Sequence, residues 1–373
     1  MKLKVILTIS FFLSINSLLA QSARYVIQGV VRDAVTEETL PFANVFLTGT
    51  TYGTITDTEG KFQLKVFERG TYELIVRFVG YQTYAAKIEF LVPETQAFDI
   101  ELTQDAINLG SVVVTDRDDE EWRRNLASFK RVFLGLTKNA QKCKILNEEE
   151  INFYYDKEKR TLEAFCTEPI LVKNDALGYR LDYYLESFII DYRNGYSSFF
   201  GFTQFKENKP RKATKKKFIK NRDRAFYGST EHFFRSLSVN SLKEEGWEVM
   251  LAEDIDGFGR VVKALDYDVY KSLKDGPTDI SKSISFEGYM YVTYLNELES
   301  DEYMGSKRAI TVGGDKLPRN PQRSWIRIIE EDGDISFESS GYVLNPLAFF
   351  SDGYWGFEKV SDMLPSNFQP SSK

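Results

Sequence analysis

Residues 24–103 contain short stretches in which apolar and polar side chains alternate. In the clearest of them, Phe62, Leu64 and Val66 alternate with polar neighbours. A period of two is typical of strands with one buried face. Turn residues such as those of Asp57–Gly60 separate the stretches. About seven short strands with no helical stretch predict a small β-sandwich over residues 21–103.

Residues 104–119 are predicted to form an acidic linker that leads into a helix. Asp116–Glu121 carries five acids in six residues, and acidic side chains favour a helix N-terminus. An apolar set then recurs at spacings of four, three and four, which puts it on one helix face. Its members are Trp122, Leu126, Phe129 and Phe133. We expect this face to pack in a core rather than to bind a ligand.

The rest of the chain mixes strand patterns with a second helix. Aromatic-rich strand patterns run from Ile145 to about Phe205, a helix is expected from Ser229, and further strands follow. Residues 331–334 carry a strong turn signal, which predicts a hairpin. We therefore expect a β-rich α+β domain over residues 120–360, a mainly β chain, and a disordered tail at 361–373.

Residues 1–20 have the features of a secretory signal peptide. Lys2 and Lys4 precede an apolar segment that is shorter and more polar than a membrane span of roughly 20 apolar residues, and Ala20 suits the cleavage site. We expect an exported protein, in the periplasm or associated with the outer membrane, that contacts a membrane only by association. Without the leader, 46 basic and 55 acidic side chains remain, a net charge of −9.

The composition excludes several classes of site. The chain has 373 residues with one His and two Cys, so neither a His-pair zinc site, such as that of a metallocarboxypeptidase, nor a four-Cys metal site can form within it. No cofactor is expected. The acidic balance argues against a nucleic-acid partner, which requires a basic surface. In an exported chain, Cys143 and Cys166 could form a disulfide or remain two small buried thiols.

The first domain resembles the carboxypeptidase-regulatory-like domain through four motifs in the right order: Gly29–Asp33, Thr39–Leu47, Gly49–Phe62 and Val79–Tyr81. That family is a transthyretin-like sandwich common in exported proteins of Bacteroidetes. The resemblance covers residues 24–103 and implies a seven-stranded sandwich and an envelope location. It does not imply peptidase activity, because the family takes its name from an accessory domain beside a catalytic one.

The segment after the sandwich resembles part of a larger protein class. Leu109–Thr115 is similar to the short strand that leads from this domain into the plug of TonB-dependent outer-membrane receptors. Only 258 residues follow Thr115, whereas a plug and a barrel of about 22 strands need several hundred. We expect related envelope machinery rather than a receptor. The C-terminal part resembles uncharacterised exported Bacteroidetes proteins, from which no activity follows.

The most uneven charge lies in residues 206–224. Ten Lys or Arg residues stand there against Glu207 and Asp223, and Pro210 indicates irregular chain. One interpretation is a solvated hairpin or loop. The other is a contact surface for an anionic polymer such as lipopolysaccharide or an acidic glycan. The candidate contact residues are Lys212, Lys215, Lys216, Lys217, Lys220 and Arg222.

Three other features favour a structural interpretation. His232 lies in a predicted helix, and no Gly-x-Ser-x-Gly elbow supplies it with a nucleophile. Asp57 and Glu59 are too few acids for a calcium loop. Phe349–Trp355 gathers four aromatic residues around a turn, which suits core packing or, alternatively, an exposed binding loop.

Two functions from different classes fit these features. The first is a non-catalytic envelope protein whose sandwich binds or docks to a glycan or an envelope protein at sheet edges and loops. The alternative is a glycan hydrolase that uses carboxylates alone in the second domain. A deep acid-lined pocket would favour the hydrolase, and shallow faces with a basic hairpin would favour binding. The sequence identifies no catalytic, cofactor-binding or metal-ligating residue.

Overall fold

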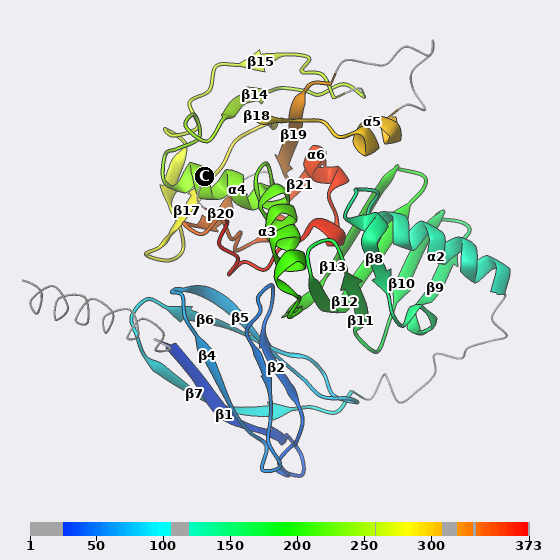
Figure 1. Ribbon diagram of the computed structural model, residues 1–373, viewed down its shortest axis with the longest axis vertical. Helices are drawn as coiled ribbons and strands as arrows, with labels where there is room; N and C mark the ends of the chain where they lie inside the picture. The colour runs from blue at the N-terminus through cyan, green and yellow to red at the C-terminus, as the bar shows by residue number, and fades with distance from the viewer. Residues whose placement is uncertain (1–24, 106–118, 258, 308–318, 331–332, 372–373) are drawn as a thin grey trace, which may run out of the picture. The chain divides into compact units, whose positions relative to one another are not determined.

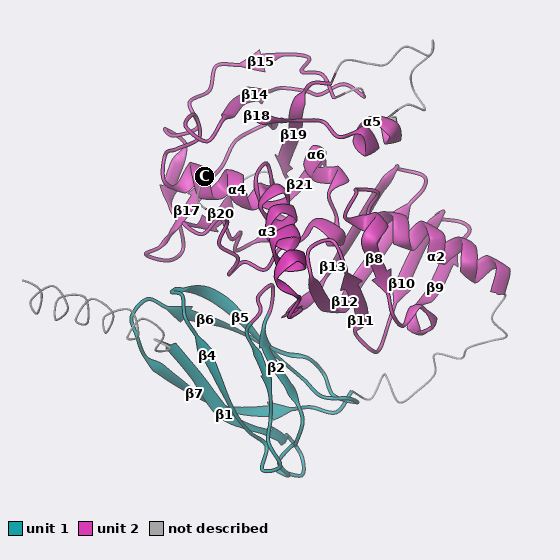
Figure 2. Ribbon diagram, in the orientation of Figure 1, with its two compact units in different colours: residues 1–47, 52–110 teal, residues 48–51, 111–373 magenta. Residues whose placement is uncertain are grey.

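The computed structural model describes residues 25–105, 119–257, 259–307, 319–330 and 333–371 (Figure 1). The predicted signal peptide and most of the predicted linker lie outside the described residues. The chain divides into two compact units (Figure 2). Unit 1 comprises residues 1–47 and 52–110, and unit 2 comprises residues 48–51 and 111–373. No helix among the described residues is long and apolar enough to cross a membrane.

Unit 1 confirms the predicted seven-stranded sandwich. One sheet has the order β4-β1-β7, in which β1 and β7 are parallel, and the other has the order β3-β2-β5-β6. The alternation in β4 places Phe62, Leu64 and Val66 in the core and the intervening Gln63 and Lys65 in solvent. The strands are β1 Tyr25–Asp33, β2 Asn44–Leu47, β3 Gly53–Ile55, β4 Lys61–Val66, β5 Gly70–Arg77, β6 Tyr84–Phe90 and β7 Thr95–Leu102.

Unit 2 begins with a helix on a six-stranded sheet. Phe129 and Phe133 of the helix α2, Asp119–Phe133, are fully buried in the core of this sheet, as their spacing predicts. The long strand β12 pairs with β13 along one edge and with β10 and β11 along the other. The strands are β8 Cys143–Ile145, β9 Asn152–Asp156, β10 Thr161–Phe165, β11 Ile170–Asn174, β12 Tyr179–Asp191 and β13 Tyr196–Glu207.

Two further sheets and the helix α4, Thr230–Ser238, complete unit 2. Phe233 of α4 packs against Trp247 of one sheet, and Phe234 packs against Phe337 of the other. The first sheet has the order β15-β14-β18-β19-β21 and the second β16-β17-β20. Their strands are β14 Trp247–Ala252, β15 Ala264–Leu265, β16 Leu273–Asp275, β17 Ser281–Ile284, β18 Tyr289–Leu298, β19 Pro321–Ile328, β20 Ile335–Glu338 and β21 Phe349–Gly353. The remaining helices are α3 Lys212–Phe226, α5 Asp301–Lys307 and α6 Tyr354–Phe357, with short 3-10 turns at Ala140–Lys142, Glu148–Glu150, Pro346–Ala348 and Val360–Asp362.

The structure corrects three expectations about local structure. Most of the basic stretch is the helix α3 rather than a hairpin or loop. The hairpin expected at residues 331–334 does not join β19 to β20, because these strands belong to different sheets, and residues 331 and 332 lie outside the described residues. The tail is packed as far as residue 371: Ser361 is fully buried, and Asp362 accepts hydrogen bonds from Thr137 and Asn139.

Candidate functional site

The five candidate lysines of the basic stretch, Lys212, Lys215, Lys216, Lys217 and Lys220, lie on α3, where all of them are exposed. Arg222 differs from the other candidate contact residues, because it is buried at 7% exposure. Its guanidinium donates to the Leu177 carbonyl, forms an ion pair with Glu207 and lies 3.9 Å from the centre of the Tyr179 ring. Arg222 therefore holds the helix in place and is not available to an anionic ligand.

Cys143 and Cys166 are both free in the structure, so the disulfide that the sequence allowed is absent there. Burial raises the pKa of Cys143 to about 12 and that of Cys166 to about 11. Raised pKa values leave few thiolates at neutral pH, which makes both side chains poor nucleophiles.

His232 is buried in the core of unit 2. Its ring lies 5.2 Å from the ring centre of Trp247, and its Nδ1 accepts a hydrogen bond from the Gly228 amide. The backbone amide of His232 binds the side chain of Ser229, which caps α4. These contacts support the structural interpretation of the residue.

The Asp57–Gly60 turn also satisfies its own acids. Asp57 accepts hydrogen bonds from the Glu59 and Lys61 amides, and Glu59 forms an ion pair with Lys61. Within the described ranges, no group of three or more His, Cys, Asp or Glu residues could hold a metal ion.

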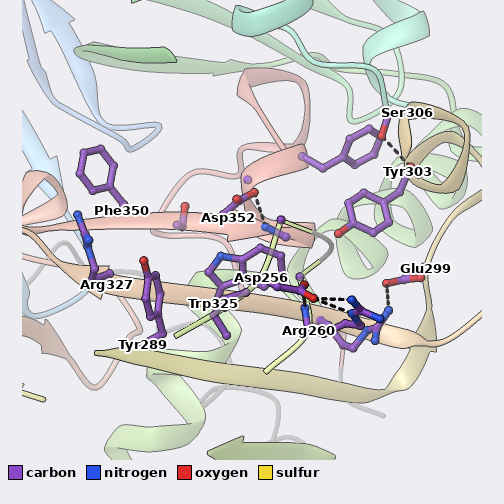
Figure 3. A pocket seen from close by; sticks show the side chains of 18 of the residues that line it. Asp256, Arg260, Tyr289, Glu299, Tyr303, Ser306, Trp325, Arg327, Phe350 and Asp352 are labelled. Atoms are coloured by element: carbon purple, nitrogen blue, oxygen red, sulfur yellow. Dashed lines mark hydrogen bonds and ion pairs between the residues drawn. The ribbon is translucent and has the colours of Figure 1, made fainter. Parts of the chain in front are cut away.

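A cavity of about 1200 Å³ lies in unit 2 (Figure 3). Its lining comes mainly from β13, β18, β19, β21, α5, α6 and residues 255–257 and 259–260. Figure 3 shows Tyr289, Arg327 and Phe350 at one end, with Tyr303 and Glu299 at the other. Chain segments far apart in the sequence therefore build one site.

The centre of the cavity is an aromatic surface made by neighbouring strands. Trp325 of β19 lies parallel to Tyr291 of β18, with 6.0 Å between ring centres and 1° between planes. Gly259, with a φ of 73°, packs against the edge of the indole, where an added Cβ would come within 2.6 Å of the ring. At the rim, Phe350 is 49% exposed. These rings give the cavity both a fixed floor and an accessible edge.

Charged groups surround these rings mostly as ion pairs. Glu299, which is 1% exposed, binds Arg323 at 3.2 Å, and Asp256 binds Arg260 at 2.7 Å. Asp352 accepts a hydrogen bond from the Gly353 amide. The lining therefore contains fewer carboxylates than basic side chains, and two of its three carboxylates form ion pairs with arginines.

Burial also sets the protonation of two side chains in and near the cavity. Desolvation raises the pKa of Tyr303 and that of Tyr291, the cross-strand neighbour of Trp325. Both phenols are protonated at neutral pH, and that of Tyr291 donates a 3.2 Å hydrogen bond to the Gly259 carbonyl.

Phe349–Trp355, the aromatic cluster noted in the sequence, fits the core-packing interpretation in part, and it forms strand β21 and the start of α6 rather than an exposed loop. Tyr354 and Trp355 are buried in the core, whereas Phe350, Ser351 and Asp352 line the cavity. Sequence reasoning missed the other cavity residues, although β19 carried a signal. Arg323, Trp325 and Arg327 alternate with buried Ser324 and Ile326, so they share the opposite face of the strand.

Comparison with known proteins identifies the first unit. Residues 27–114 match the CarboxypepD_reg-like domain family. The chain therefore contains a CarboxypepD_reg-like domain. All four motifs noted in the sequence lie within the matched residues. The CarboxypepD_reg-like domain match does not extend to the residues that line the cavity.

A curated protein adds a partial relationship. The TonB-dependent receptor SusC of Bacteroides thetaiotaomicron is 32% identical over 142 residues, which are 38% of this chain and 13% of the receptor. This chain thus spans a small part of that relative.

Solved structures add little beyond the CarboxypepD_reg-like domain. A putative carbohydrate binding protein from Bacteroides uniformis is 10% identical, with a TM-score of 0.19 over 43% of this chain and 58% of that one. A putative membrane-associated protein of unknown function from Bacteroides fragilis is 18% identical, with a TM-score of 0.18 over 43% and 65% of the two chains. Scores this low carry no argument about function.

Proposed function

We propose that this chain is an exported, non-catalytic binding protein of a bacterial cell envelope, and that its cavity in unit 2 binds a glycan. The observation that carries the proposal is the meeting of exposed aromatic edges with hydrogen-bonding side chains in one cavity. The sandwich was the expected binding surface, but the geometry favours unit 2. The CarboxypepD_reg-like domain and the partial relationship to SusC support the envelope location.

Sugar chemistry matches the lining. A pyranose ring has an apolar C–H face and a rim of hydroxyls, so it requires an aromatic surface flanked by polar groups. Phe350 and Tyr289 offer such surfaces at one end, where Arg327 lies 5.8 Å from the centre of the Tyr289 ring. Pockets for drug-sized ligands enclose roughly 300–1000 Å³, so a cavity of about 1200 Å³ has room for more than one sugar ring.

Hydrolysis is less well supported by the same residues. A glycosidase needs one carboxyl that stays protonated until it donates to the leaving group, usually because its surroundings are apolar or acidic. Glu299 and Asp256 instead face arginines at ion-pair distance. Such carboxylates orient other groups and accept hydrogen bonds from a ligand, which is the role of a binding site.

The test is a glycan array followed by calorimetry on residues 21–373. The variant Phe350→Ala/Tyr289→Ala should weaken binding at least tenfold, because each truncation removes an aromatic contact of about 1 kcal/mol. The control Phe67→Ala removes a phenylalanine of similar exposure, 47%, from the sandwich, and it should bind normally. Equal loss in both variants, or cleavage of a bound glycan, would contradict the proposal.

A further inference from the structure

The helix α3 has two chemically distinct faces. Its buried side chains are Phe218, Asn221, Arg222, Ala225 and Phe226. Its exposed cations are Lys212, Lys215, Lys216, Lys217, Lys220 and Arg224. None of these lysines forms an ion pair with a residue in the described parts of the chain. In a protein of net negative charge, this face is a concentrated positive surface.

The lysines form a regular row. Lys212, Lys216 and Lys220 are four residues apart, so they lie above one another on the helix. At a rise of about 1.5 Å per residue, adjacent members are about 6 Å apart along the axis. Lys217 and Arg224 are seven residues apart, which is about two helical turns, so they align with each other and form a second, shorter row beside the first.

This arrangement opposes helix formation. Like charges four residues apart repel one another, and Lys212 and Lys215 lie in the first turn, where the helix dipole favours acids. That turn contains no acid, and Arg211 at the N-cap makes no capping side-chain hydrogen bond. The exposed sequence of α3 therefore works against its own structure, and an anionic partner would relieve the repulsion.

Packing holds the helix despite this charge. Asn221 donates a 2.7 Å hydrogen bond to the Ala176 carbonyl, and Arg222 binds the Leu177 carbonyl at 2.7 Å. Both acids of the stretch are engaged, since Glu207 pairs with Arg222 and Asp223 accepts a hydrogen bond from the Ser371 amide. The row of lysines is consequently presented on a fixed support.

We propose that this face of α3 docks the protein onto an anionic lipid surface through headgroup phosphates. Lysine ammonium groups are point charges, without the planar fork by which arginine selects a particular carboxylate. The exposed positions of the helix carry no aromatic ring that could stack on a sugar, since Phe218 and Phe226 are buried. Several undirected charges on a firm support suit the dense phosphates of a lipid surface. This inference is independent of the cavity.

The test is cosedimentation of residues 21–373 with phosphatidylcholine vesicles that contain or lack phosphatidylglycerol. Binding should require phosphatidylglycerol and should decline as salt is added. The variant Lys212→Gln/Lys216→Gln/Lys220→Gln should bind roughly 100-fold more weakly, because each lysine near an anionic surface contributes about fivefold. It should remain folded, since the substitutions remove repulsion within α3.

The matched control is Lys142→Gln/Lys144→Gln/Lys157→Gln, which changes the net charge equally at exposed positions of unit 2. It should retain binding. Equal weakening by the two variants would overturn the proposal, as would the absence of binding to phosphatidylglycerol vesicles. Tighter binding to soluble polygalacturonate than to the vesicles would also overturn it and would assign the face to an acidic glycan.

Discussion

Tyr81 donates a 2.6 Å hydrogen bond to Asp33 across 48 residues of sequence. The two residues end separate motifs of the CarboxypepD_reg-like domain, and the contact joins them at one end of the sandwich. The same carboxylate accepts hydrogen bonds from Gln104 and from the Val35 and Thr36 amides. Two motifs of the family therefore meet at a single, fully engaged carboxylate.

The first prediction concerns the pH dependence of this contact. Hydrogen bonds, led by that from Tyr81, hold the pKa of Asp33 well below its usual value of 3.8. A pKa that is lower in the folded state stabilises the protein at pH values above the pKa of the unfolded state. This stabilisation is lost as the pH falls towards the pKa of the folded state. Tyr81→Phe should therefore lower Tm near neutral pH, and the difference should narrow below about pH 4. Calorimetry over this range checks it, and a pH-independent difference would contradict it.

The second prediction compares two arginines of the cavity. Arg323→Ala leaves Glu299 buried without its partner, which should reduce the free energy of unfolding by about 3 kcal/mol. Arg260→Ala breaks an ion pair in which the arginine is 70% exposed, and the loss should stay below about 1 kcal/mol. Urea unfolding of the two variants measures both values. Similar losses would show that burial does not distinguish the pairs.

The third prediction concerns two glycines of one loop. Gly259→Ala should displace the loop from Trp325, because the new Cβ meets the indole and φ is 73° there. Gly257→Ala is the control, since a Cβ at that position meets no atom within 4 Å. Near-UV circular dichroism and glycan affinity should change in the first variant alone. Unchanged spectra in Gly259→Ala would show that the loop does not support the ring.

The fourth prediction concerns thiol reactivity. Because burial raises the pKa values of Cys143 and Cys166, native protein should react slowly with iodoacetamide near neutral pH. Denaturant without reductant should make both cysteines react rapidly. Mass spectrometry counts the added groups. Protein that gains none after denaturation would contain a disulfide instead.

Much of the fold could be predicted because apolar and polar residues recur along the sequence with the period of a strand or of a helix. Residues 61–66 show it in unit 1, and Phe129 and Phe133 show the helical equivalent in unit 2. Helix α3 escaped prediction because Asn221 and Arg222, two of its buried residues, are polar, so no apolar stripe marks it.

The cavity escaped prediction for a different reason. Trp325 pairs with Tyr291 on one side and with Asp352 on the other. Pairing between strands so distant in sequence depends on tertiary packing, which local patterns do not record. The aromatic cluster Phe349–Trp355 was visible in the sequence, but its pairing with the strand that carries Trp325 was not.

The contacts of Ser361 and Asp362 have a consequence for biosynthesis. Asn174 of β11 donates a 2.8 Å hydrogen bond to the Ser361 carbonyl, 187 residues later in the chain. Val360 lies in the core of the same sheet. A ribosome must therefore translate nearly the whole of unit 2 before the core of the six-stranded sheet is complete. Until then the nascent sheet keeps a gap in its core, and a chain that terminates before Val360 should be a preferred substrate for quality-control proteases.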